Sequence, residues 1–288
     1  RRLFRSQGVT YRHEPLATLG DSLVLGRLTV SGAGAAGKTW DVGAFEHENV
    51  ELIEVDAEGR RRRHEVFATH HLGDAVVRLY QRYAELLPDG PDRERAAAIA
   101  RSVAAMVGTP DLDRLAVAFA PGIEGIDHRI LGTYSASGAR AVLEGYRALF
   151  ELSENVAWVD DAVLALKSNA LLMRRVHSAT ARNGGGAYER PFLLLIVFGA
   201  DGRIERLEWF DHGRETEALA RFDELTSPAF SPACPAPAVS ARSPQEPRPA
   251  YARRVRPNAV TANTAVSITS SRGVATACAS RCDIVRAL

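Results

Sequence analysis

Apolar and polar residues alternate with a period of two over many short segments of this chain, which is typical of half-buried β-strands. The expected strands are residues 21–28, 45–55, 60–67, 123–130, 156–166, 170–178, 188–198 and 203–210. Apolar residues recur at helical spacing in residues 74–87, 93–107, 110–120, 137–152 and 215–225. Thr109 is expected to cap the helix that begins at Pro110. The pattern predicts a mixed α+β fold.

One arrangement of strand, tight turn and strand occurs twice. Residues 186–211 repeat the pattern of residues 43–68, with Gly, Arg, Glu and Phe at matching positions. Residues 9–17 and 21–28 match residues 156–164 and 168–175 in the same way. We therefore expect two tandem modules, the first of them truncated. They are the C-terminal half of a first module at residues 1–88, a complete module at residues 91–226, and a proline-rich linker with a disordered tail at residues 227–288.

Composition and charge exclude several kinds of partner. The net charge of +1 provides no concentrated positive field, so neither nucleic acid nor a membrane is expected to bind. The longest apolar run, residues 192–198, is far shorter than the ~20 residues that span a bilayer. No signal segment opens the chain, which predicts a cytoplasmic location. The cysteines lie in the tail at Cys234, Cys278 and Cys282, and neither a disulfide nor a metal site is expected.

A glycine-rich loop is the one apparent nucleotide motif. Residues 32–39 read GAGAAGKT and formally match the P-loop pattern. Phosphate binding by that motif depends on a helix that starts directly after the loop. Here an alternating strand, residues 45–55, follows instead. We therefore interpret the loop as a hairpin tip and expect no nucleotide or other cofactor.

The complete module ends in a recognisable pattern. Residues 197–211 read VFGADGRIERLEWFD, with an acidic Asp-Gly-Arg-Ile turn, alternating charges and an aromatic-Phe-Asp strand end. This pattern resembles the SnoaL-like branch of the nuclear transport factor 2-like superfamily. The resemblance implies a cone-shaped, curved antiparallel sheet whose packed helices enclose an apolar pocket. Tandem copies also resemble the C-terminal regions of large bacterial multidomain proteins.

The resemblance also suggests residues for acid–base chemistry. Arg175 and His177 share a strand face with Leu171 and Met173, because side chains alternate along a strand. Together with Asp211, they are similar to the Arg-x-Asp and distant Asp of the epoxide hydrolases in this superfamily, with His177 replacing one carboxylate. The resemblance implies that His177 and Asp211 exchange protons beside Arg175. The alternative is a salt-bridged set outside any pocket. The matching first-module positions, Leu28, Val30 and Ala68, cannot exchange a proton.

Further residues are expected to line the implied pocket. His128 shares a strand face with Ile126 and Ile130, and we expect that face to point inward. Trp158 and Trp209 either line the pocket or pack beside it. The expected pocket-lining set is therefore His128, Trp158, Leu171, Met173 and Trp209.

The fold predicted here occurs both with and without catalysis, so two functions remain open. The first is a non-catalytic pair of modules in a larger bacterial protein, which binds a small apolar molecule or mediates pairing within the chain or in a homodimer. The alternative is an acid–base enzyme, related to epoxide hydrolases or ketosteroid isomerases, that uses the pocket of the second module. Geometry distinguishes the two, because the enzyme needs His177 and Asp211 beside one enclosed space.

Overall fold

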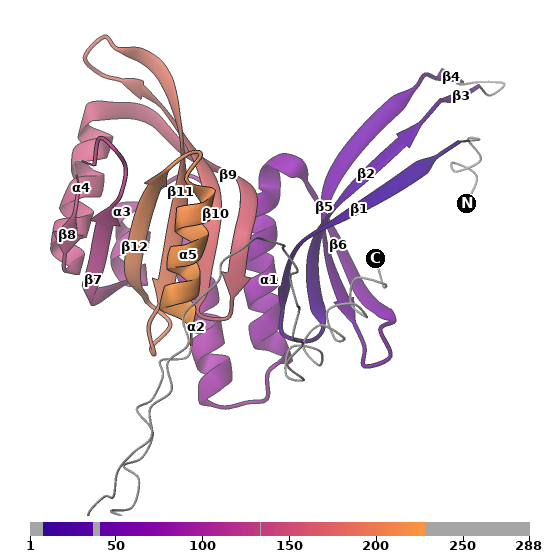
Figure 1. Ribbon diagram of the computed structural model, residues 1–288, viewed down its shortest axis with the longest axis horizontal. Helices are drawn as coiled ribbons and strands as arrows, with labels where there is room; N and C mark the ends of the chain where they lie inside the picture. The colour runs from indigo at the N-terminus through magenta and orange to yellow at the C-terminus, as the bar shows by residue number, and fades with distance from the viewer. Residues whose placement is uncertain (1–7, 37–40, 133, 228–288) are drawn as a thin grey trace, which may run out of the picture.

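The structure, a computed structural model, describes residues 8–36, 41–132 and 134–227. Over these residues the chain forms two large antiparallel-rich sheets, a short two-stranded sheet and five α-helices (Figure 1). The predicted linker and tail after residue 227, and the centre of the glycine-rich loop at residues 37–40, lie outside these ranges. The strands and helices correspond closely to the segments predicted from the residue pattern. The predicted α+β class is confirmed.

The N-terminal sheet has four long strands in the order β1-β2-β5-β6, all antiparallel. Its strands are β1 (Thr10–Leu19), β2 (Leu23–Gly32), β5 (Phe45–Val55) and β6 (Arg61–Ala68). The short pair β3 (Ala35–Ala36) and β4 (Asp41–Val42) lies between β2 and β5. A strand thus follows the glycine-rich loop, and the helix that a P-loop requires is not found among the described residues there.

One helix covers the N-terminal sheet. After a short 3-10 turn, η1 (Thr69–His71), the chain forms α1 (Leu72–Leu86). Leu72, Val76 and Leu79 are fully buried because they recur on one helical face. They join a core with Leu25 of β2 and Leu52 of β5. The apolar positions of the two strands and the helix therefore face one another.

The C-terminal sheet has the strand order β8-β7-β12-β11-β10-β9. Its strands are β7 (Phe119–Asp127), β8 (Ala136–Ser137), β9 (Ser153–Lys167), β10 (Ala170–Ala181), β11 (Gly186–Phe198) and β12 (Ile204–Asp211). All neighbours are antiparallel except β7 and β12, which run parallel. The helices are α2 (Pro91–Ala105), α3 (Leu112–Ala118), α4 (Ala139–Leu152) and α5 (Glu215–Thr226).

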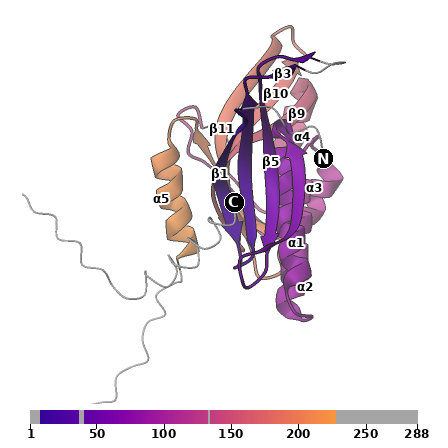
Figure 2. The ribbon, with the colours of Figure 1, turned by 90° about the vertical axis from the view of Figure 1, so that its right-hand side faces the viewer.

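Helices lie on both faces of the C-terminal sheet, with α5 on one side and α2, α3 and α4 on the other (Figure 2). Strand alternation supplies an apolar surface to each side. Leu172 and Leu195 pack with Phe222 of α5. The adjacent residues Leu171 and Leu194 pack in the core on the other side. The continuous apolar run of β11 is therefore needed because both faces of this strand are buried.

The turn between β11 and β12 is held against α2. Gly202 has φ +78°, a left-handed conformation that glycine adopts without strain. A Cβ atom at this position would lie 2.6 Å from Ala98 on α2. The Ser102 hydroxyl donates a hydrogen bond to the Gly202 carbonyl oxygen over 2.9 Å. The Asp-Gly-Arg turn thus fixes the end of the β11–β12 hairpin to α2.

The start of α3 differs from the prediction. Asp111, not Thr109, caps the helix, and its Oδ1 accepts a hydrogen bond from the Arg114 backbone N–H over 3.0 Å. The preceding residues are drawn away from the helix because Gly108 forms an isolated bridge with Trp158. The helix therefore begins at the next residue with a suitable side-chain acceptor.

The two sheets share one continuous core, and α1 lies between them (Figure 1). The Tyr80 hydroxyl of α1 donates hydrogen bonds to the carbonyl oxygens of Lys167 and Ala170, over 2.7 and 3.1 Å. Burial raises the pKa of this hydroxyl, which therefore stays protonated. At the other end of α1, a Cβ atom on Gly73 would lie only 2.9 Å from Oδ2 of Asp160.

Candidate functional site

A cavity of about 320 Å³ lies between α4 and the face of the C-terminal sheet that points away from α5. Side chains of β9, β10, β11 and β12 form its floor, and α4 with the segment after β7 closes it. Its apolar and aromatic lining comprises Leu149, Leu152, Trp158, Phe192, Leu194 and Trp209. Its polar lining comprises Arg129, Tyr134, Tyr146, Arg175, His177 and Arg190.

Arg175 is the most deeply buried cation of the cavity. Only 1% of the residue is exposed, and its guanidinium donates two hydrogen bonds to the carboxylate of Asp160, over 2.7 and 3.0 Å. The guanidinium carbon lies 5.0 Å from the ring centre of Trp158. A bidentate pair fixes both the position and the plane of the guanidinium. Arg175 is therefore a rigid, neutralised part of the wall.

A second arginine is held in the same manner. Arg129 donates hydrogen bonds of 2.7 and 2.8 Å to the two carboxylate oxygens of Asp127, at the end of β7. These hydrogen bonds raise the pKa of Arg129. Burial acts in the opposite direction but has the smaller effect. Its guanidinium carbon lies 5.9 Å from the ring centre of Phe192. Asp127 thus places a charged side chain along an otherwise aromatic wall.

His177 is buried in the cavity wall without a hydrogen-bond partner for Nε2. Only 7% of the residue is exposed, and its ring stacks on Tyr188 with centroids 5.8 Å apart. Burial and then the nearby charges of Arg190, Arg129 and Arg175 lower the pKa of His177 to about 4. The imidazole is therefore neutral at pH 7.

His177 gives the protein a pH dependence with a definite sign. In the unfolded chain, His177 has its ordinary pKa of 6.5. In the folded chain the pKa is about 4, so the imidazole stays neutral until the pH falls to about that value. The stability that depends on neutral His177 is thus complete above pH 6.5 and is lost as the pH falls toward 4, at up to ~1.4 kcal/mol per pH unit. We expect His177→Phe to flatten this part of the pH profile in urea unfolding.

A matched histidine variant separates this effect from general acid denaturation. His70 is exposed at the surface, so His70→Phe should leave the contribution of buried His177 to the pH profile in place. Parallel profiles for the wild-type protein and His177→Phe between pH 4.5 and 7.5 would contradict the burial of a neutral imidazole.

Arg190 and Tyr146 are two further polar residues of the lining. Arg190 is exposed on β11 at the mouth of the cavity and is the direct strand neighbour of His177. Its guanidinium carbon lies 5.8 Å from the ring centre of Tyr188. Within the described part of the chain, no carboxylate forms an ion pair with Arg190. Burial raises the pKa of Tyr146, so its phenol remains a hydrogen-bond donor at neutral pH.

The structure brings together part of the predicted site. Arg175, His177, Trp158 and Trp209 all line the cavity. Leu171 and Met173 lie on the same side of the sheet but are packed in the core and do not line the cavity. Met173 contacts the site only indirectly, because its sulfur lies 3.5 Å from Nη2 of Arg175.

Asp211 lies apart from the cavity lining. Its Oδ2 accepts a hydrogen bond from the backbone N–H of Ile130 over 2.8 Å. The carboxylate adds to the field that raises the pKa of Arg129, but Asp211 itself does not line the cavity. The predicted set of Arg175, His177 and Asp211 is therefore not assembled around one space. Asp211 instead fixes the segment that follows β7.

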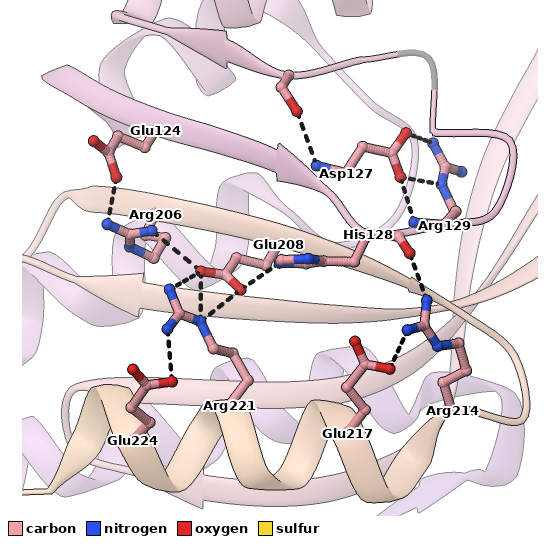
Figure 3. Close-up of polar contacts among 11 residues, drawn as sticks. Glu124, Asp127, His128, Arg129, Arg206, Glu208, Arg214, Glu217, Arg221 and Glu224 are labelled. Carbon is pink, nitrogen blue, oxygen red and sulfur yellow. Dashed lines mark hydrogen bonds and ion pairs between the residues drawn. The ribbon is translucent and has the colours of Figure 1, made fainter.

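His128 lies on the other side of the sheet from the cavity, in contrast to the prediction. Its Nε2 is 2.8 Å from Oε2 of Glu208, and its ring stacks on Phe210 at 4.5 Å (Figure 3). The prediction chose the wrong strand face, because Ile123, Gly125 and Asp127 alternate toward the cavity side of the sheet and His128 falls on the opposite side. His128 belongs instead to an ion-pair cluster beneath α5.

That cluster centres on Glu208, whose side chain is fully buried (Figure 3). Arg206 donates a hydrogen bond of 3.2 Å to it, and Arg221 of α5 donates three of 3.0 to 3.2 Å. Burial alone would raise the pKa of Glu208, but the hydrogen bonds from Arg221 and His128 outweigh it and keep the pKa below its ordinary value. The cluster thus fastens α5 to the sheet.

Neither a metal site nor a membrane-crossing helix is found among the described residues. No group of His, Cys, Asp and Glu side chains in residues 8–36, 41–132 and 134–227 has a geometry that holds a metal ion. In the same ranges, no helix is both long and apolar enough to cross a membrane.

Comparison with known proteins gives matches only among solved structures. No protein-family model matches the sequence, and no curated protein is similar to it. Solved structures resemble this chain over part of its length.

Three of these structures illustrate the similarity. A protein with a ketosteroid isomerase-like fold from Catenulispora acidiphila, in complex with trimethylamine, is 16% identical over 39% of this chain and 82% of its own, with a TM-score of 0.33. An NTF2-like protein from Burkholderia thailandensis is 19% identical over 47% of this chain and 98% of its own, with a TM-score of 0.34. An LEH-like epoxide hydrolase from M. tuberculosis is 16% identical over 46% of this chain and 93% of its own, with a TM-score of 0.33. These names agree with the resemblance stated from the sequence, and the likeness concerns the fold alone.

Proposed function

We propose that this chain binds a small, largely apolar molecule in the cavity beneath α4, without chemical conversion. The supporting observation is the cavity itself. Its volume of about 320 Å³ lies in the range of small-molecule sites, and aromatic and aliphatic side chains dominate its lining. A few polar groups held in fixed positions, such as the Arg175–Asp160 pair, are the usual means of orienting a ligand in such a site.

We further propose that the two halves of the chain are tandem modules that pair within the molecule. A recurring contact supports this proposal. Glu65 on β6 accepts hydrogen bonds from Arg78 on α1, as Glu208 on β12 does from Arg221 on α5. In both halves the last strand of a sheet is therefore joined to the following helix by the same pair of residue types.

An acid–base enzyme is the second candidate, and His177 is the observation that favours it. His177 lines the cavity, and its Nε2 has no hydrogen-bond partner and is free to accept a proton. Two features weigh against it. The pKa of about 4 makes the imidazole a poor base at neutral pH, and Asp211 is bonded to the Ile130 backbone outside the cavity.

The binding proposal can be tested with a neutral aromatic probe. We expect naphthalene-2-carboxamide to bind the wild-type protein saturably in calorimetry, because the apolar wall provides the main driving force. Leu149→Trp fills the cavity from α4 and should weaken binding at least tenfold. Leu219→Trp makes the same change on α5, where the residue is 37% exposed, and should have no effect.

Two outcomes of this experiment would contradict the proposal. The absence of saturable binding would remove the ligand-binding role, and equal affinity in Leu149→Trp would place binding elsewhere. Incubation with a hydrophobic epoxide then addresses the second candidate. Diol formation that disappears in His177→Ala would favour the enzyme.

A further inference from the structure

The positive charges that line the cavity are not all neutralised by carboxylates of the protein. Two of its three guanidinium groups are neutralised by their own carboxylates, Arg175 by Asp160 and Arg129 by Asp127. The third, Arg190, forms no ion pair with any carboxylate among the described residues. One positive charge therefore lacks a counterion at the mouth of a largely apolar cavity.

The groups beside Arg190 are suited to a negatively charged partner. Its strand neighbour His177 is more than nine-tenths buried, and no hydrogen bond satisfies Nε2. A buried polar atom without a partner costs free energy, and a ligand that supplies the partner recovers it. Among the nearby charges, Arg190 lowers the pKa of His177 most, as expected for its direct strand neighbour.

The remaining lining restricts the rest of the ligand. Phe192, Leu194 and Trp158 provide flat, apolar surfaces, and the cavity holds a body of one or two rings at about 320 Å³. The paired guanidiniums of Arg129 and Arg175 have little remaining attraction for a second charge, because each already binds a carboxylate in a bidentate manner.

We propose that the ligand is an aromatic or alicyclic monocarboxylic acid, bound with its ring against Phe192 and Trp158 and its carboxylate between Arg190 and His177. This inference rests on the proposed binding function of the same cavity. It adds the charge of the ligand, the number of charged groups and the end of the cavity at which the charge lies.

A matched set of probes separates this inference from the binding function. Naphthalene-2-carboxylate and naphthalene-2-carboxamide have nearly the same shape and differ in charge. At pH 7.5 and low salt, we expect calorimetry to show the carboxylate binding about tenfold more tightly than the amide to the wild-type protein, since a contact with a charged donor is worth that much. In Arg190→Gln the two affinities should agree within about twofold.

The control variant is Arg182→Gln. Arg182 lies in the turn between β10 and β11, pairs with Glu154 and does not line the cavity. The variant Arg182→Gln removes the same charge from the protein as Arg190→Gln does. Because Arg182 is outside the cavity, the preference for the carboxylate should remain about tenfold. A preference that falls equally in Arg182→Gln and Arg190→Gln would indicate a general charge effect and would overturn the placement at Arg190.

Other outcomes bear on the two claims separately. If the amide binds as tightly as the carboxylate, the ligand-binding function stands and the inference of an acid is wrong. If 2-naphthyl phosphate, which carries two charges, binds more tightly than the carboxylate, a single-charge site is wrong. If neither the amide nor the carboxylate binds, the proposed function fails together with the inference.

Discussion

Replacing Asp160 with Asn is expected to lower the free energy of unfolding by about 3–5 kcal/mol, because it leaves the charge of Arg175 buried without a counterion. Both side chains are almost completely enclosed, with 1% exposure for Arg175 and 3% for Asp160. The Asn side chain retains the shape of the carboxylate, so the loss reflects charge rather than packing. Urea unfolding followed by circular dichroism measures the change directly.

The neighbouring residue provides a matched control. Asp161 pairs with Arg174 over 2.7 Å on the same two strands, but their side chains are 39% and 34% exposed. Pairs in contact with water contribute little, so Asp161→Asn should cost less than about 1 kcal/mol. In addition, Asp160→Leu combined with Arg175→Met should recover much of the lost stability, since no unpaired charge remains. Equal losses for Asp160→Asn and Asp161→Asn would contradict the role of burial.

Replacing Glu208 with Gln should destabilise the protein by about 2–4 kcal/mol, because it weakens hydrogen bonds from three cationic or polar partners at once. Glu208 is fully buried, whereas its partners Arg206 and Arg221 are 24% and 26% exposed. The partners can thus regain water, which keeps the loss below that at Asp160. The measurement is again the free energy of unfolding in urea.

The corresponding residue in the N-terminal half serves as the comparison. Glu65 accepts hydrogen bonds from Arg63 and Arg78, but its side chain is 27% exposed. Glu65→Gln should therefore cost clearly less than Glu208→Gln. Hydrogen exchange gives a second readout, since the amides of α5 should exchange faster in the Glu208 variant and those of α1 should not. A larger loss at Glu65 would contradict the ranking by burial.

The fold could be predicted from the sequence because local and tertiary preferences agree along most of the chain. The alternating run that predicts residues 203–210 is β12, and the amphipathic segment 215–225 is α5. The predicted helix 74–87 is α1, with its apolar stripe against the sheet. The short strands β3, β4 and β8 were not predicted, because two residues are too few to show a period.

The site could be predicted only in part, because it depends on strand register. Arg175 and His177 follow from alternation along a single strand, which needs no knowledge of the neighbour. The partner of Arg175 does not. A two-residue turn after Lys167 would place Ala162 opposite Arg175, but two irregularities in β9 shift the pairing to Asp160. Such bulges leave no clear sequence signal.

The cavity residue Arg129 and its partner Asp127 were missed because the face of this strand was predicted wrongly. The inward face of this strand was predicted to be that of Ile126, His128 and Ile130, whereas Ile123 and Asp127 lie on it. β7 ends at Asp127, and the chain then turns so that Arg129 reaches back to bond the Asp127 carboxylate. The spacing of Asp127 and Arg129, two residues apart, could have suggested an ion pair. Whether the two side chains meet depends on where the strand ends, which the residue pattern did not define.

The close approach of Gly73 to Asp160 has a consequence for cooperativity. A side chain at Gly73 would collide with the carboxylate that holds Arg175, so the packing of α1 and the geometry of the cavity wall are mechanically coupled. Free-energy coupling between two sites is reciprocal. We therefore expect a ligand that contacts the wall to strengthen the docking of the N-terminal sheet. Heat should then unfold both halves in one transition whose midpoint rises with ligand concentration.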